Sequence, residues 1–137
     1  MQTRADFLGV WQLNRHIDDR HGHQQGLFQG RAIFHENGPD QLDYIEEGQI
    51  QFGSGPVLTA NRRYQWHFMD THIEVRFENG DAFHSFVAAG QADGTEHPCG
   101  DDHYTVRYDF KNWPQWQATW QVTGPRKDYT SITQYRR

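Results

Sequence analysis

Hydrophobic and polar side chains alternate along most of this chain. Apolar residues share one parity of position in four runs: Leu42, Tyr44, Ile50 and Phe52; Ile73, Val75 and Phe77; Tyr104, Val106, Tyr108 and Phe110; and Trp116, Ala118, Trp120 and Val122. Successive side chains of a strand point to opposite faces, so a period of two predicts strands with one buried face. Together with the flanking segments, the runs predict about nine strands and no long helix.

Short turns separate these runs, and the clearest is Asn79-Gly80. This dipeptide between alternating runs is typical of a two-residue type I′ hairpin turn. Such a turn places Phe77 opposite Ala82 and Val75 opposite His84. Because directly opposed residues share a face, His84 is predicted to point into the core.

A second hairpin turns near Asp70. A two-residue turn there places Tyr64 and Trp66 on the inner face of their strand, and Arg62 follows them inward near one end. A three-residue loop would reverse these orientations. The shorter turn agrees with the apolar parity of the neighbouring strand, so we expect the inward orientation.

Glu46 shares the inward parity of Tyr44, and Gly48 in the same strand indicates a bulge or a sharp bend. Strands joined in order by short turns favour a meander that closes on itself and so removes its exposed edges. The predicted fold is therefore all-β: a single up-and-down antiparallel β-barrel spanning residues 1–137. Barrels of this size can hold one small ligand.

The length of 137 residues fits one domain with a single core. Mean hydropathy is −0.97 although 15% of the residues are aromatic, so Trp, Tyr and Phe must supply most of the buried area. A net charge of −5 with scattered basic residues argues against nucleic acid as a partner. No apolar run is long enough to span a membrane, and the first residues do not resemble a signal peptide. With a single cysteine, these features predict a cytoplasmic protein.

Parity gathers polar and aromatic side chains inside the predicted barrel: Glu46, Arg62, His84 and Tyr104, walled by Tyr64, Trp66, Trp116 and Trp120. An unpaired polar group in an apolar core costs roughly 2–7 kcal/mol, and a charge costs more. These groups must therefore satisfy one another, for example through a Glu46–Arg62 ion pair, or line a cavity for a polar ligand. The sequence leaves both alternatives open. In the second, Arg62 attracts an anionic group and the aromatic rings hold a planar body.

Residues 88–100 form the longest segment without a strand pattern. Long loops in compact domains are often lids or binding loops, so we expect this segment over the mouth of the barrel, with His97, Cys99 and Asp102 near the opening. Lys127 either closes the mouth by pairing with an acidic residue, Asp102 or Glu46, or remains solvated.

The same segment contains metal-binding and nucleophilic residue types. His97, Cys99 and His103 do not have the spacing of known zinc sites, so we predict no metal. Cys99 as a nucleophile beside His97 is an alternative, although a free cysteine in a loop is more often a small packing residue. No cofactor is predicted.

Gly9-Val10-Trp11 on the first strand, with arginines ending the last strand, resembles the lipocalin and wider calycin arrangement. In that superfamily the first-strand Trp closes the barrel base and a late Arg stacks on it. The resemblance implies a cation–π contact between Trp11 and Arg136 or Arg137.

Nearly the whole chain also resembles a bacterial family of unknown function with a lipocalin-like barrel. The matching residues are Tyr44, Glu46 and Gly48; Phe77 to Gly80; Phe83 and His84; His97, Cys99, Asp102 and Tyr104; and the segment from Trp120 through Gly124, Pro125 and Lys127 to Tyr129. This resemblance implies the fold and no particular activity.

Three classes of function fit these expectations. The first is a binding protein for a small aromatic or amphipathic anion, with Arg62, Tyr64, Trp66, His84, Tyr104, Trp116, Trp120 and Lys127 as ligand-binding residues. The second is a cofactor-free lyase, isomerase or hydrolase in which His84, close to Glu46, acts as general base, or Glu46 does. The third is an interaction module with a filled core. The sequence favours the binding protein and leaves a homodimer open.

Overall fold

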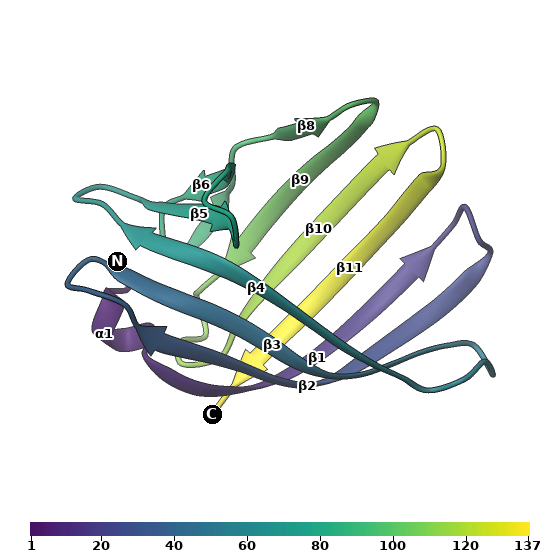
Figure 1. The fold of residues 1–137 in the computed structure, drawn as a ribbon, viewed down its shortest axis with the longest axis horizontal. Helices are drawn as coiled ribbons and strands as arrows, with labels where there is room; N and C mark the ends of the chain where they lie inside the picture. Colours follow the sequence, from purple (N-terminus) through teal and green to yellow (C-terminus); the bar gives the residue numbers. More distant parts are fainter.

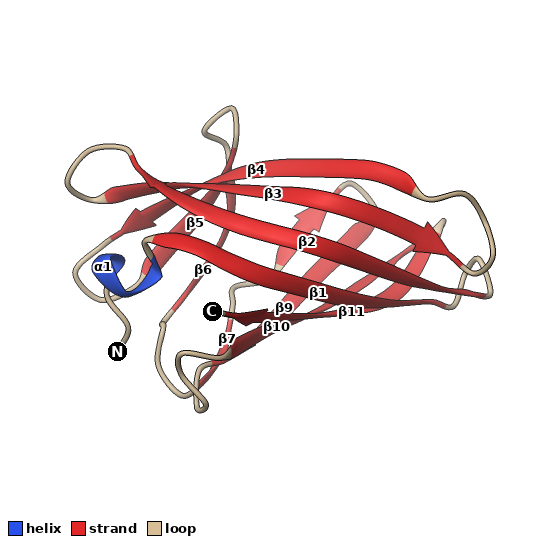
Figure 2. Cartoon of the chain, turned by 90° about the horizontal axis from the view of Figure 1, so that it is seen from below, coloured by secondary structure: helices blue, strands red, loops and turns tan.

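The computed structural model describes residues 1–137 and consists almost entirely of β-strands (Figure 2). One short helix, α1 (Arg4–Phe7), precedes β1 (Gly9–Asp19), β2 (Gln24–Glu36), β3 (Gln41–Phe52), β4 (Leu58–Phe68), β5 (Ile73–Phe77), β6 (Ala82–Phe86), β7 (Gln91–Asp93), β8 (His97–Cys99), β9 (Asp102–Asp109), β10 (Trp116–Gly124) and β11 (Lys127–Arg136). No helix has the length and apolar character needed to cross a membrane.

The strands form one antiparallel sheet that curls into a nearly closed barrel (Figure 1). Their order is β6-β5-β4-β3-β2-β1-β11-β10-β9-β7, and β8 pairs with β9 as well. Pairing of β1 with β11, for example Leu13 opposite Tyr135, joins the first and last strands. The prediction of an all-β, up-and-down barrel is confirmed.

The strand count is eleven rather than nine because the segment 88–100 is not irregular throughout. It contains β7 and β8, which each contribute three residues and pair with β9. Between them, the backbone N–H of Thr95 donates to the carbonyl of Ser85 on β6 at 2.9 Å, and the N–H of Ser85 donates to the Thr95 hydroxyl at 2.9 Å. These bonds bridge the seam between β6 and the segment of β7 and β8, where no continuous ladder forms.

Aromatic side chains close one end of the barrel, beside α1. Phe7 and Trp11 are fully buried, and the Trp11 indole N–H donates to the carbonyl of Phe7 at 2.8 Å. The Arg137 guanidinium lies 3.9 Å from the centre of the Trp11 ring. The predicted cation–π contact is thus confirmed, and Arg137 is the arginine that makes it.

The β5–β6 hairpin confirms part of the predicted register. Val75 lies opposite His84, and His84 is buried. The predicted two-residue turn is wrong: the N–H of Phe77 donates to the carbonyl of Asp81, so the loop has three residues. Its last residue, Gly80, has a φ of +92°, a conformation that glycine adopts without strain and that ends such loops in a bulge.

The longer loop would reverse the faces of β6, but a second irregularity restores them. Arg76, not Phe77, lies opposite Ala82, and the register shifts again between Val75 and Arg76, which leaves Phe83 as an extra residue. A bulge re-aims the side chain that it carries. Phe83 therefore enters the barrel next to His84.

The other two backbone predictions have different outcomes. The predicted two-residue turn near Asp70 is confirmed and consists of Asp70 and Thr71, because Phe68 lies opposite Ile73 and the N–H of Met69 donates to the carbonyl of His72. The prediction of a bulge at Gly48 is wrong, because β3 keeps the same register with β2 and with β4 on both sides of this residue.

Instead, Gly48 lies directly opposite Gly30 of β2. A Cβ atom on either glycine would collide with the other strand's backbone. The glycine pair therefore permits a close approach of β2 and β3 in the middle of the barrel wall.

We predict that Arg137→Ala lowers the free energy of unfolding by about 2 kcal/mol, because it removes the contact with Trp11 and two hydrogen bonds to the carbonyls of Leu8 and Asp6. Arg136→Ala is the matched control, because Arg136 is exposed and has no such contacts. Urea unfolding measures both. Equal losses would show that the contact with Trp11 contributes nothing.

Candidate functional site

The barrel encloses a cavity of about 400 Å³, within the range of small-molecule sites. Its lining includes Asp19 and His21 at the β1–β2 turn and Arg126 at the β10–β11 turn, which marks its mouth. Both turns lie at the end of the barrel away from α1 (Figure 1). Its lining residues are Arg15, Ile17, Asp19, His21, Tyr44, Glu46, Ile50, Phe52, Arg62, Tyr64, Trp66, Val75, Phe83, His84, Tyr104, Tyr108, Ala118, Trp120, Val122, Arg126, Lys127, Tyr129, Ser131 and Tyr135. The core is therefore not filled.

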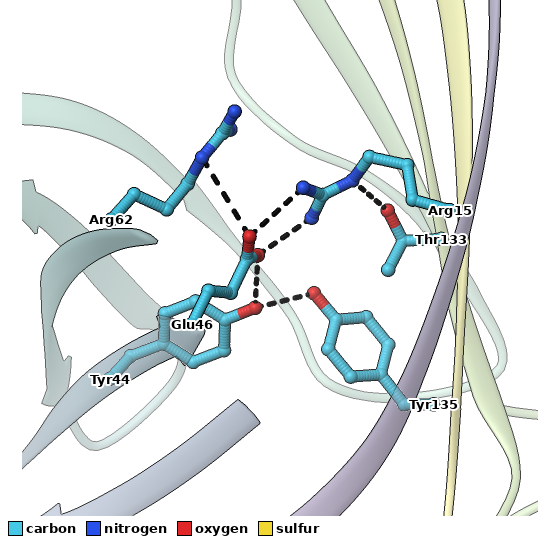
Figure 3. Close-up of polar contacts among 6 residues, drawn as sticks. All are labelled: Arg15, Tyr44, Glu46, Arg62, Thr133 and Tyr135. Atoms are coloured by element: carbon cyan, nitrogen blue, oxygen red, sulfur yellow. Dashed lines mark hydrogen bonds and ion pairs between the residues drawn. The ribbon is translucent and has the colours of Figure 1, made fainter. Parts of the chain in front are cut away.

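A charged network centred on Glu46 forms one wall of the cavity (Figure 3). The Glu46 carboxylate is 3% exposed and accepts two hydrogen bonds from Arg15, at 2.9 Å from Nη1 and 2.6 Å from Nη2. The Nε–H of Arg15 donates to the hydroxyl of Thr133 at 2.7 Å. Arg15 comes from β1, Glu46 from β3 and Thr133 from β11, so the network spans neighbouring strands of one wall.

Tyrosine hydroxyls extend the network in one direction. The Tyr44 hydroxyl donates to Oε2 of Glu46 at 2.5 Å, and its oxygen lies 2.8 Å from the Tyr135 hydroxyl. Because Tyr44 gives its proton to Glu46, Tyr135 must donate to Tyr44. Burial alone would raise the pKa of Glu46, but the charge and hydrogen bonds of Arg15 outweigh it and hold that pKa below its usual range. The carboxylate therefore stays ionised.

Arg62 is the second cation beside this carboxylate. Its Nε lies 3.7 Å from Oε1 of Glu46, and its side chain is 54% exposed, whereas that of Arg15 is 9% exposed. Both oxygens of Glu46 already accept from Arg15, so the predicted Glu46–Arg62 ion pair exists only as a longer, secondary contact. Two guanidinium groups share one carboxylate, which leaves a positive charge at this wall.

Aromatic rings form another part of the cavity wall, backed by Phe77. Phe83 stacks on Trp120 with ring centres 5.1 Å apart and planes 11° apart, and on Phe77 with centres 4.5 Å apart. Tyr64 also lies nearly parallel to Phe83, at 5.6 Å. Such a set of parallel faces suits a flat, unsaturated molecule.

His84 also lies on the aromatic side of the cavity. Its Nε2 is 2.8 Å from the hydroxyl of Tyr108, and its Nδ1 has no partner. Burial lowers the pKa of His84 to about 3, so the ring is neutral near pH 7. We expected His84 close to Glu46; the structure shows no hydrogen bond or ion pair between them, because Arg15 and Tyr44 occupy the carboxylate.

The cavity brings together most of the residues predicted to bind a ligand: Arg62, Tyr64, Trp66, His84, Tyr104, Trp120 and Lys127, together with Glu46. Trp116 is the exception. It is 3% exposed and lies deeper, stacked on Tyr135 with ring centres 3.7 Å apart. Parity identifies the inner face of a strand but not the depth along the barrel, which is why Trp116 was misplaced.

The segment 88–100 supplies no lining residue, so it does not enclose the cavity. Its end nevertheless lies near the mouth, because Cys99 pairs with Asp102 and the next residue, His103, pairs with Thr123 beside the β10–β11 turn. His97 packs against the rings of Phe77 and Phe83, and Cys99 is exposed. Lining residues at the mouth come from the β1–β2 and β10–β11 turns.

At that mouth, Lys127 donates to the Tyr104 hydroxyl at 2.9 Å and pairs with Asp102 at 3.2 Å. Asp102 itself is not a lining residue. Of the two sequence alternatives for Lys127, pairing with an acidic residue is the one seen. No three His, Cys, Asp or Glu side chains converge as metal ligands, and His103 pairs with Glu96 instead of meeting His97.

Sequence reasoning missed Arg15, the main charged partner of Glu46. The signal was present, because Arg15 has the same parity as Trp11 and Leu13 on β1. Thr133 and Tyr135 could likewise have been found by parity along β11. Phe83 could not, because only the bulge in β6 turns it inward.

Comparison with known proteins places the chain in a family. Residues 7–137 match the model of DUF6314, a family of unknown function. The chain belongs to this family. No curated protein matches its sequence.

Two solved structures show the same fold. An S-type phycobiliprotein lyase, CPES, from Guillardia theta has a TM-score of 0.73 at 9% identity, covering 97% of this chain and 89% of that one. A DUF3598 protein of unknown function from Nostoc punctiforme has a TM-score of 0.61 at 9% identity, covering 98% of this chain and 48% of that one. This chain thus spans about half of the DUF3598 protein. At such low identity the likeness extends to the barrel and no further.

We predict that Arg15→Met destabilises this protein by about 3–5 kcal/mol, because it leaves the buried Glu46 carboxylate without its main partner. Arg31→Met is the matched control: Arg31 pairs with Glu47 on the outer face, where the two side chains are 57% and 45% exposed, and should cost at most about 1 kcal/mol. Urea unfolding compares the two. Similar losses would contradict the central role of the buried pair.

We also predict a stability loss in mild acid that depends on His84. Its pKa is about 3 when folded against 6.5 for an ordinary imidazole, so the unfolded chain binds more protons between these values. Neutral His84 therefore makes its full contribution to the free energy of unfolding above about pH 6.5. That contribution is lost as the pH falls towards 3, by roughly 1.4 kcal/mol per pH unit. Wild type should therefore lose roughly 2 kcal/mol more than His84→Gln between about pH 7 and pH 5. Parallel pH profiles from urea unfolding would contradict this assignment.

Proposed function

We propose that this protein binds a small, planar, anionic molecule inside its barrel. The observation that carries the proposal is the surplus guanidinium of Arg62, which faces the cavity half-exposed beside a carboxylate already held by Arg15. Hydrogen bonds from arginine to a carboxylate or phosphate are among the strongest in proteins. An anionic group on the ligand would receive them without displacing Glu46.

The aromatic wall supports the planar part of the proposal. Phe83 and Trp120 stack in nearly parallel planes and both line the cavity. A flat ligand with its anionic group at Arg62 can lie against these rings and bury most of its surface. The charge of the lining residues points the same way: four are arginine or lysine and two are aspartate or glutamate, in a chain whose net charge is −5.

The alternative, a cofactor-free enzyme with His84 or Glu46 as general base, has less support. A general base works best with a pKa near the operating pH, and the pKa of His84 is about 3. Glu46 is ionised, but both of its oxygens accept short hydrogen bonds. A phycobiliprotein lyase shares this fold, so the barrel itself is compatible with either use.

We predict that Arg62→Ala weakens binding of an aromatic carboxylate by about 10- to 100-fold while the matching uncharged carboxamide loses less than about threefold. Quenching of tryptophan fluorescence can report binding, because Trp66 and Trp120 line the cavity. Arg63→Ala is the control, because Arg63 alternates to the outer face of β4 and is not a lining residue. Equal losses for both ligands would make Arg62 structural, and failure of all aromatic anions to bind wild type would overturn the proposed function.

A further inference from the structure

One buried polar atom in the cavity wall has no hydrogen-bond partner. Three buried side-chain nitrogens lack a partner: Nε of Arg4, Nδ1 of His84 and Nε1 of Trp116. Of these three residues, only His84 lines the cavity. The other ring nitrogen of His84, Nε2, is paired with Tyr108, whose hydroxyl has no further hydrogen bond. His84 and Tyr108 are 6% and 3% exposed and the Nδ1 atom is covered, so bulk water satisfies neither group, and a ligand in the cavity reaches Nδ1 only if the neighbouring side chains move.

This pair is uncharged over the physiological range. Burial lowers the pKa of His84 to about 3, and burial also raises the pKa of Tyr108 well above its ordinary value of 10. The two side chains therefore share two protons, one on the imidazole and one on the phenol. The pair carries no positive charge that could offset a second buried anionic group, and burying such a group in apolar surroundings is costly, so an uncharged acceptor suits this position better.

Counting donors and acceptors decides where the imidazole proton lies. If Nε2 carries it and donates to Tyr108, both the phenolic O–H and the Nδ1 acceptor are left unpaired. If Nδ1 carries it, Tyr108 donates to Nε2 and only the Nδ1–H is left unpaired. Each buried unpaired donor costs about 1–3 kcal/mol, so the second arrangement is favoured. The unpaired group of His84 is then a donor.

We infer that the ligand of this protein carries, besides its anionic group, an uncharged hydrogen-bond acceptor that binds the Nδ1–H of His84. This inference rests on the proposed function and narrows the ligand class to planar anions with a carbonyl oxygen or a pyridine-type nitrogen in the ring system. Arg62 on β4 holds the anionic group, and His84 on β6 holds the acceptor. His84 thereby acts as a specificity-determining residue.

The aromatic neighbours of His84 fit this role. Its ring is perpendicular to those of Phe83 and Trp120, with interplanar angles of 88° and centre distances of 4.6 and 4.9 Å. A planar ligand stacked parallel to Phe83 presents its edge to the space beside His84. Lone pairs of carbonyl and pyridine-type acceptors lie in that plane.

Three bicyclic carboxylates of similar size test the inference in the intact protein: a naphthalene carboxylate with no ring heteroatom, a chromone carboxylate with a carbonyl acceptor, and an indole carboxylate with an N–H donor. We expect wild type to bind the chromone compound about 5- to 10-fold more tightly than the other two. His84→Phe should abolish this preference and keep the dependence on Arg62. Tyr108→Phe, which leaves the imidazole proton free to move, should reduce the preference while keeping ring packing.

Nitrogen NMR of ¹⁵N-histidine-labelled protein provides a second, ligand-independent readout. The inference requires the Nδ1–H tautomer of His84 in the free protein and a shift of the Nδ1 resonance on adding the chromone compound. An Nε2–H tautomer in the free protein, or equal affinity for all three carboxylates with Arg62 dependence intact, would overturn the inference and leave the proposed function standing. Absence of binding by every carboxylate would overturn the proposed function as well.

Discussion

The buried ion pair of Arg15 and Glu46 is the interaction on which the interior depends. Moving two charges out of water costs several kcal/mol per ion, and only close geometry with further hydrogen bonds offsets this cost. Here the carboxylate accepts two bonds from Arg15 and one from Tyr44, while Arg15 also donates to Thr133. The pair connects β1 with β3 across β2, so it ties together two strands that are not neighbours in the sheet. Because it satisfies Glu46 completely, it also leaves the charge of Arg62 uncompensated.

Network and cavity were opposing explanations of the inward polar residues, and the structure contains both. The network occupies one wall, and the cavity separates it from the aromatic rings of Phe83 and Trp120. The interior is therefore asymmetric: charge on the side of β1, β3 and β4, and neutral groups on the side of β6, β9 and β10. An asymmetric site fixes the orientation of a ligand that is itself charged at one end. This is why Arg62 and His84 are assigned different parts of the same molecule.

Sequence reasoning recovered the barrel because alternation survives in nearly every strand. It placed His84 inside although its turn type was wrong, because the three-residue loop and the bulge at Phe83 cancel in their effect on parity. The same bulge brought Phe83 into the cavity, which no period of two can predict. The inward orientation of Arg15 could have been predicted, because Arg15 has the same parity as Trp11 and Leu13 on β1. Trp116 shows the remaining limit: a face is encoded locally, whereas depth along the barrel depends on how all strands tilt and pair.

The size of the cavity constrains how the interior can be stable without a ligand. Empty apolar space costs about 24 cal/mol per Å³, so a dry cavity of about 400 Å³ would cost roughly 10 kcal/mol, comparable with the whole stability of a domain. Hydration avoids this cost where polar groups and an opening are present, and both exist at the wall with Arg62 and at the mouth with Lys127. The aromatic side around His84 offers water few partners, and its Nδ1 remains unpaired. A ligand that displaces water from the charged side and supplies an acceptor on the other side therefore gains binding free energy from both sides of the cavity. The aromatic plug of Phe7, Trp11 and Arg137 at the far end contributes the packing that the open end lacks.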